Sequence, residues 1–191
     1  MRIVGGKFGG RRLAGPKSNT NRGLIRPTSD RNRESLFNIL AARMDVTGKR
    51  VIDLFAGTGA LGLEALSRGA SYALFVDNST EGRALLRTNI EQLGLQGCTR
   101  IFRRDATRPG PCGNMPPFDL AFLDPPYAKG LGERALAALR DGGWLADDAL
   151  VILEENTAAM PGSFDGYDVL DLRTRGETSI AILSPSETLH R

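Results

Sequence analysis

The sequence predicts a single α/β domain of three layers, in which helices cover both faces of a seven-stranded, mostly parallel sheet in a Rossmann-like arrangement. Three observations support this fold class. From residue 49 onward, short apolar runs alternate with segments of helical periodicity. Most of these runs are apolar at consecutive positions, as expected for strands with helices on both sides. The last two runs are close enough to pair as a hairpin, which gives the sheet an antiparallel edge strand.

A small extension precedes the alternating region. Residues 3–15, IVGGKFGGRRLAG, have the pattern of two short strands joined by Gly-Gly, and a polar, turn-rich stretch follows at residues 16–23. A helix is then expected, with Thr28 or Ser29 as its N-terminal cap. Four apolar residues share one face of this helix: Leu36, Phe37, Leu40 and Met44. The extension is therefore predicted to be a β-hairpin followed by a helix.

The alternating region predicts the remaining elements in order. Strands of the parallel sheet are expected at residues 50–55, 72–77, 99–105, 118–124 and 149–155. Helices are expected between them at residues 60–68, 80–93 and 131–140. The hairpin strands are expected at residues 167–172 and 178–183.

Length and composition limit the possible classes of protein. With 191 residues, 41% of them hydrophobic, the chain can bury one full core, so we expect one domain at residues 29–191 with residues 1–28 as a basic N-terminal arm. No apolar run approaches the roughly 18 residues needed to cross a bilayer, and the start lacks the apolar core of a secretory signal, which predicts a cytoplasmic protein. Cys98 and Cys112 form no CxxC pair and the only histidine is His190, so no metal site is expected.

The charge is distributed unevenly along the chain. Residues 1–50 hold 12 Lys/Arg against 3 Asp/Glu, whereas residues 51–191 hold 13 against 19. Nine basic residues fall within the first 33 positions: Arg2, Lys7, Arg11, Arg12, Lys17, Arg22, Arg26, Arg31 and Arg33. A flexible, solvated tail would explain such an arm, but nucleic acid is the usual partner of a basic segment of this kind.

Candidate ligand-binding residues follow the predicted strands, because ligands of open α/β sheets bind beyond the carboxyl ends of the strands. After the first strand, Gly57, Gly59 and Gly62 form the pattern GxGxxG at the start of a helix. With 23 glycines this pattern arises by chance about 0.3 times, but its position between a strand and a helix strengthens it. The second strand ends at Asp77, where a carboxylate can accept the hydroxyls of a ribose, and the third ends at Asp105.

The fourth strand ends in Asp124-Pro125-Pro126-Tyr127, directly after the apolar run FDLAFL. The pattern Asp/Asn/Ser-Pro-Pro-aromatic is expected by chance about 0.005 times in a chain of this composition. Both prolines fix φ and lack an N–H donor, and Pro125 favours an extended Asp124. The result is a stiff edge of hydrogen-bond acceptors beside an aromatic ring, which suits a flat base that carries an amino group.

Other interpretations of these residues exist. Asp53 and Asp77 can each cap the helix that follows, and Asp105 can begin a loop, but capping does not require an acid at four successive strand ends. The glycine pattern also fits a nicotinamide or flavin enzyme. However, Asp53 immediately before the glycines would repel a diphosphate, and it is better suited to a cationic ligand such as S-adenosylmethionine, which has a sulfonium and an ammonium.

These segments, in this order and separation, resemble motifs I to IV of class I S-adenosylmethionine-dependent methyltransferases that act on exocyclic amines: DLFAGTGALG, Asp77, Asp105-Ala106 and DPPY. Together with RIVGGKFGGRRL at residues 2–13 and RPTSDRNRESLFNIL at residues 26–40, they resemble the RsmD group of bacterial 16S rRNA guanine-N2 methyltransferases. The RPTSDR segment discriminates this group, because DNA adenine-N6 and glutamine-N5 methyltransferases share the other motifs. The resemblance covers almost the whole chain and implies the Rossmann-like methyltransferase fold.

The resemblance also implies a role for each candidate residue. The catalytic residues would be Asp124, Pro125, Pro126 and Tyr127, with Asp124 and the Pro125 carbonyl holding the amino group and Tyr127 stacking on a flipped base. The methyl donor S-adenosylmethionine would be bound by Thr28, Asp53, Phe55, Gly57, Gly59, Asp77, Asn78, Asp105 and Ala106. RNA would be bound by Arg11, Arg12, Arg22, Arg26, Arg31 and Arg33.

The expected substrate is 16S rRNA within an assembled or assembling small ribosomal subunit, and the protein is expected to be a monomer with no membrane partner. Two other functions stay open. A DNA adenine-N6 methyltransferase shares DPPY, but 191 residues leave no room for the separate target-recognition region usual in such enzymes. A non-catalytic RNA-binding protein with a retained nucleotide pocket is disfavoured, because every motif position is chemically competent.

Overall fold

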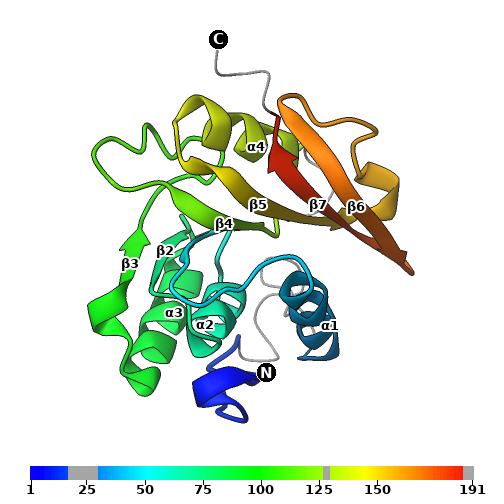
Figure 1. Ribbon diagram of the computed structural model, residues 1–191. Helices are drawn as coiled ribbons and strands as arrows, with labels where there is room; N and C mark the ends of the chain where they lie inside the picture. Colours follow the sequence, from blue (N-terminus) through cyan, green and yellow to red (C-terminus); the bar gives the residue numbers. More distant parts are fainter. Residues whose placement is uncertain (17–29, 127–129, 187–191) are drawn as a thin grey trace.

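The computed structural model describes residues 1–16, 30–126 and 130–186. It has one seven-stranded sheet with the order β3-β2-β1-β4-β5-β7-β6 (Figure 1). In chain order the strands are β1 (Arg50–Leu54), β2 (Tyr72–Val76), β3 (Thr99–Phe102), β4 (Phe118–Leu123), β5 (Leu145–Asn156), β6 (Tyr167–Arg175) and β7 (Thr178–Pro185). The seven-stranded, mostly parallel sheet predicted from the sequence is confirmed.

The parallel part of the sheet has β1 at its centre. This strand pairs with β2 on one side and with β4 on the other, and β3 and β5 extend the sheet outward from there. The chain therefore winds in one direction through β2 and β3 and in the opposite direction through β4 and β5. Ligands of such sheets bind at the carboxyl ends of the strands near this change of direction.

The last two strands form the predicted antiparallel hairpin. β7 is antiparallel to both of its neighbours, and β6 is the outer strand. Both strands are longer than the apolar runs that predicted them, since β6 continues to Arg175 at the turn and β7 continues to Pro185 at its far end. β5 also begins earlier than predicted, at Leu145, beyond an irregularity in its pairing with β4.

Among the described residues, four helices cover the sheet: α1 (Asp30–Ala41), α2 (Ala60–Ser67), α3 (Thr80–Leu93) and α4 (Leu131–Asp141). α1, α2 and α3 pack on one face and α4 on the other (Figure 1). Successive strand residues alternate between the two cores: Val51 and Phe75 contact the three-helix side, whereas Ile52 and Leu74 contact the α4 side. This double coverage explains the consecutive apolar positions. No helix in the described ranges is long and apolar enough to span a membrane.

The N-terminal segment, residues 1–16, folds against α2. The predicted hairpin is present only as a single antiparallel bridge between Arg2 and Arg12, and its turn contains the short 3-10 helix η1 (Gly6–Phe8). Ile3, Phe8 and Leu13 are buried in the same core as α1 and α2. The segment is therefore anchored to the domain by apolar contacts.

Shorter differences from the predicted elements occur elsewhere. Met44 lies beyond the end of α1 and packs partly buried against the core rather than continuing the helical face. Two further 3-10 helices are η2 (Gln96–Cys98) and η3 (Thr157–Ala159). The predicted turn-rich stretch after residue 16 and the predicted cap residues Thr28 and Ser29 lie outside the described residues.

Candidate active site

The ends of β1, β2 and β4 lie level at one edge of the sheet. Their register makes the residues that directly follow these strands, Phe55, Asp77 and Asp124, neighbours across that edge. Adjacent strands are about 4.8 Å apart, so all three can face one small ligand. Phe102 ends β3 one strand further out, and its carbonyl accepts the N–H of Asp77 at 3.1 Å. The structure thus brings three of the predicted strand-end residues together.

The loop between β1 and α2 is tightly constrained. Phe55 has a φ of 59°, a left-handed conformation that is uncommon for a non-glycine residue and is often found at functional sites. A Cβ on Gly59 would lie 2.3 Å from the side chain of Leu86, and a Cβ on Gly62 would lie 2.4 Å from the ring of Phe75. These glycines allow the loop and the first turn of α2 to pack tightly against β2 and α3.

Asp53 lies beneath this loop and is only 2% exposed. One carboxylate oxygen accepts the N–H of Gly62, in the first turn of α2, at 3.0 Å. Burial raises the pKa of Asp53 to about 8, and the nearby charge of Asp77 adds to the increase, while the Gly62 hydrogen bond opposes it. A buried acid of this kind is stabilised in its ionised form by a cation, so its chemistry fits an ammonium group.

Asp77 connects the glycine loop to the start of α3. Its carboxylate accepts the N–H of Gly57 at 2.7 Å and the N–H of Ser79 at 2.6 Å. Ser79 is the N-cap of α3 and accepts the N–H of Gly82 at 3.1 Å. Asp77 is buried at 8% exposure, whereas Asn78 beside it is exposed. Each carboxylate oxygen has a second lone pair, so these bonds leave Asp77 able to accept from a ligand hydroxyl.

Asp105 lies beyond the end of β3 rather than at it. The strand stops at Phe102, and Asp105 is exposed, whereas Ala106 is buried. The Asp105 carboxylate accepts the backbone N–H and the hydroxyl of Thr107, each at 2.8 Å. The bond from the Thr107 backbone is the main reason that the pKa of Asp105 is lowered. Asp105 therefore begins a loop, and this arrangement keeps its carboxylate ionised.

The Asp124-Pro125-Pro126 segment follows β4 directly. Asp124 is half-buried, Pro125 is buried and Pro126 is half-buried, so the segment is packed into the domain at the edge shared with Phe55 and Asp77. Tyr127 lies outside the described residues. Within the described ranges, no cluster of three or more His, Cys, Asp or Glu side chains could hold a metal ion.

Comparison with known proteins identifies the family. A family profile described as "Conserved hypothetical protein 95" matches residues 1–184. Ribosomal RNA small subunit methyltransferase D of Escherichia coli is 40% identical over 81% of this chain and 74% of its own length. The protein of the same name from Haemophilus influenzae is 35% identical over 94% of this chain and 91% of its own length. The chain belongs to this RsmD family of methyltransferases.

Solved structures agree with the RsmD assignment. The Escherichia coli protein yhhF superimposes with a TM-score of 0.81 at 32% identity, covering 97% of this chain and 98% of that protein. TrmN from Thermus thermophilus has a TM-score of 0.64 at 23% identity, which shows a shared fold. The predicted family, fold class and methyltransferase activity are therefore confirmed.

The structure corrects one of the RNA-binding residues predicted for this RsmD-family chain. Arg33 is fully buried and forms ion pairs with Asp30 at 2.9 Å and with Glu64 at 3.4 Å. It also donates to the carbonyl of Arg2. Arg33 therefore holds α1 against α2 and the N-terminal segment and cannot reach an RNA phosphate.

Three of the other predicted RNA-binding residues lie on the surface of the protein. Arg11, Arg12 and Arg31 are exposed. Arg22, Arg26 and the predicted cofactor residue Thr28 lie outside the described residues.

Two polar residues of α3 near the site were not predicted from the sequence. Arg83 is buried and donates to the carbonyl of Asp77 at 3.3 Å. Asn89 is fully buried and donates to the carbonyl of Thr58, in the glycine loop, at 2.9 Å. Both lie on the helix face that also contains Leu86 and other buried residues. A polar residue at an inward position of an amphipathic helix is the sequence signal that would have identified them.

Proposed function

We propose that this RsmD-family protein transfers the methyl group of S-adenosylmethionine to the exocyclic N2 amine of a guanine in 16S rRNA of the small ribosomal subunit. The observation that carries the proposal is the position of Asp124-Pro125-Pro126, level with the constrained glycine loop at neighbouring strand ends. An acceptor segment for an amino group and a candidate donor-binding loop thus meet at one edge. The relatives named ribosomal RNA small subunit methyltransferase D support the choice of rRNA.

The residues of the loop fit the proposed methyl donor. S-adenosylmethionine would supply an electrophilic methyl group on a sulfonium. Asp53, buried with a raised pKa, would bind the ammonium of the methionyl part and become ionised in doing so. Asp77 would accept the ribose hydroxyls, and the exposed Asp105 with the Ala106 N–H would contact the adenine. Thr28, Phe55, Gly57, Gly59 and Asn78 complete the proposed cofactor set.

The residues after β4 would orient the guanine. The lone pair of N2 is delocalised into the ring, so the nitrogen is a weak nucleophile until its two hydrogens are held. Asp124 and the Pro125 carbonyl would accept these N–H bonds and stabilise the positive charge that develops on nitrogen in the transition state. Pro126 would keep this edge rigid, and Tyr127 would stack on the flipped base. This mechanism uses no metal ion.

The basic N-terminal arm would bind the RNA backbone. Arg11 and Arg12 are exposed on a segment that is anchored through buried Ile3 and Leu13. We propose these residues, with Arg22, Arg26 and Arg31, as phosphate contacts. Residues 1–28 would act as the RNA-binding arm of a monomeric, cytoplasmic enzyme, and residues 29–191 as its methyltransferase domain.

One assay tests the proposal directly. The protein is incubated with labelled S-adenosylmethionine and, separately, with undermethylated small subunits, naked 16S rRNA and DNA, and the modified nucleoside is identified by mass spectrometry. We expect N2-methylguanine from a small-subunit or rRNA substrate. Label in adenine of DNA would instead support a DNA methyltransferase, and absence of transfer to any substrate would contradict the proposal.

A further inference from the structure

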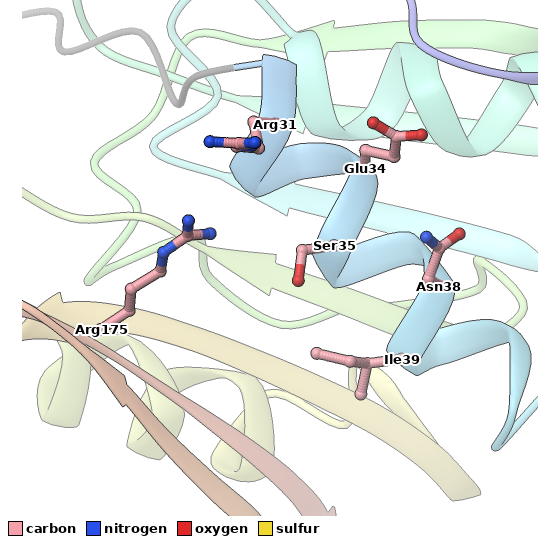
Figure 2. Close-up of a pocket in the computed structure, with 6 residues that line it drawn as sticks. All are labelled: Arg31, Glu34, Ser35, Asn38, Ile39 and Arg175. Atoms are coloured by element: carbon pink, nitrogen blue, oxygen red, sulfur yellow. The ribbon is translucent and has the colours of Figure 1, made fainter.

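A groove of about 460 Å³ lies between α1 and the β6–β7 hairpin (Figure 2). It is lined by Arg31, Glu34, Ser35, Asn38, Ile39 and Arg175. The first five belong to α1, whereas Arg175 is at the end of β6, far away in the sequence. None of the motifs at the strand ends explains this groove.

The residues of the groove change from charged to polar to apolar along one stripe of α1. Arg31, Ser35 and Ile39 are spaced four residues apart, so they lie one above another on the same face of α1. In Figure 2 the side chains of Arg31 and Arg175 lie at the same end of the groove, while Glu34 and Asn38 extend from the neighbouring stripe of the helix. Guanidinium and hydroxyl groups are common protein donors to the phosphates and sugars of nucleic acids.

The two groove arginines differ from other arginines of this region. Arg2 and Arg33 pair with Asp30, and Arg43 and Arg173 pair with Asp171. By contrast, among the residues that the structure describes, neither Arg31 nor Arg175 forms an ion pair with a carboxylate. Arg175 instead donates a long hydrogen bond of 3.5 Å to the side-chain oxygen of Asn32. Two exposed guanidinium groups without a carboxylate partner are therefore available to an anion.

We infer that this groove binds a nucleotide of the substrate RNA outside the modified base, with a backbone phosphate held between Arg31 and Arg175. The inference rests on the proposed function and adds to it, because it places an RNA contact on the C-terminal hairpin. A phosphate suits the guanidinium groups of Arg31 and Arg175, because a guanidinium binds phosphate through directed hydrogen bonds as well as through its charge. Glu34 would disfavour a phosphate further along the helix, which fixes the anion at the arginine end.

The test uses the variants Arg31→Ala and Arg175→Ala and the double variant that combines them. The control is Arg87→Ala, which removes one positive charge from an exposed position on α3. Binding of undermethylated small subunits and of naked 16S rRNA is measured over a series of salt concentrations, and cofactor affinity and the thermal midpoint report on folding. Each single groove variant should weaken RNA binding about three- to tenfold. The slope of log affinity against log salt concentration should fall by the equivalent of about one phosphate contact in each single variant and of about two in the double variant. Arg87→Ala should change neither quantity by as much.

The outcomes separate the two proposals. If the unaltered protein binds and methylates rRNA but the groove variants keep its affinity and salt slope, the groove inference is wrong and the proposed function stands. If the unaltered protein neither binds nor methylates small subunits or naked rRNA, both fail. A fall in affinity no larger than that of Arg87→Ala would also contradict the groove, because it would reflect net charge alone.

Discussion

Two carboxylates of the site, Asp53 and Asp124, differ in their surroundings. Asp53 is 2% exposed beneath the glycine loop, with a pKa raised to about 8, whereas Asp124 is half-buried at the end of β4. The buried surroundings of Asp53 suit a carboxyl group that becomes ionised when a cation binds. The partly exposed position of Asp124 suits a carboxylate that accepts hydrogen bonds from a substrate amine. Substitution of each residue therefore has a different expected result.

Replacement of Asp124 should affect turnover and not cofactor binding. Asp124→Asn keeps the size of the side chain but removes the negative charge that would stabilise the transition state. We expect the turnover number to fall about 10²- to 10³-fold, the range found when one preorganised electrostatic contact is removed. Cofactor affinity, measured by calorimetry, should stay within about twofold, since the loop after β1 is unchanged. Asp148→Asn, an exposed residue of β5, is the matched control; retained turnover in Asp124→Asn would refute the acceptor role.

Replacement of Asp53 should raise stability while weakening cofactor binding. Asp53 binds its proton more tightly in the folded protein, where its pKa is about 8, than in the unfolded chain, where it has its ordinary value of 3.8. Its contribution to stability is therefore full below about pH 4 and is lost as the pH rises to about 8. Asp53→Asn has no such proton and can still accept the N–H of Gly62, so the variant should gain stability over the unaltered protein across this range.

The measurement for Asp53→Asn is the thermal midpoint of the cofactor-free proteins from pH 4 to pH 9. We expect the difference in midpoint to grow with pH and to exceed about 3 °C at pH 8. The same variant should bind S-adenosylmethionine at least about tenfold more weakly, because the ion pair to the ammonium is lost. A midpoint difference that does not change with pH would show that Asp53 is ionised in the free protein.

At the scale of elements, the sequence predicted helices well where burial is periodic and parallel strands well where burial is continuous. β1, β2 and β4 end within one residue of their predicted ends, because helices on both sides require apolar residues along the whole strand. The N-terminal hairpin was harder to predict, since its glycines permit a 3-10 turn with one bridge in place of two regular strands. Arg33 shows a different cause of error. It lies three and four residues before buried Leu36 and Phe37, so the same periodicity that predicted the helix places it inside.

α3 links the N-terminal segment to the glycine loop through Asn89. Its side chain accepts the N–H of Ala14 at 2.6 Å and donates to the carbonyls of Ala14 and Thr58 at 3.1 and 2.9 Å. Asn89→Ala should destabilise the protein by about 2–3 kcal/mol, because the buried partners lose their hydrogen bonds. Denaturant midpoints measure this change. Thr88→Ala, at the exposed neighbouring position, should change stability by less than about 0.5 kcal/mol, and an equal effect of both variants would contradict the link.

At the scale of the whole molecule, basic residues are concentrated in the first part of the chain, which folds into the N-terminal segment, α1 and the start of β1 (Figure 1). Glu64 of α2 holds this part in place: its carboxylate accepts the N–H groups of Val4 and Gly5, each at 2.8 Å, and pairs with Arg33 and Arg68. Charge counts along the sequence indicated a nucleic-acid partner. They could not show that some of these arginines form ion pairs within the protein. The structure separates the internal arginines from the exposed ones.

The exposed arginines of the arm should therefore act on RNA alone. Arg11 and Arg12 lie on a segment whose fold depends on buried apolar side chains and on Glu64, so Arg11→Ala/Arg12→Ala should leave the thermal midpoint and cofactor affinity nearly unchanged. The same double variant should weaken rRNA binding and reduce its salt slope by up to about two phosphate contacts. Filter binding at several salt concentrations measures both quantities. Because a purely solvated tail would change neither, an unaltered salt slope would assign the basic arm to solubility and leave the RNA contacts to other surfaces of the domain.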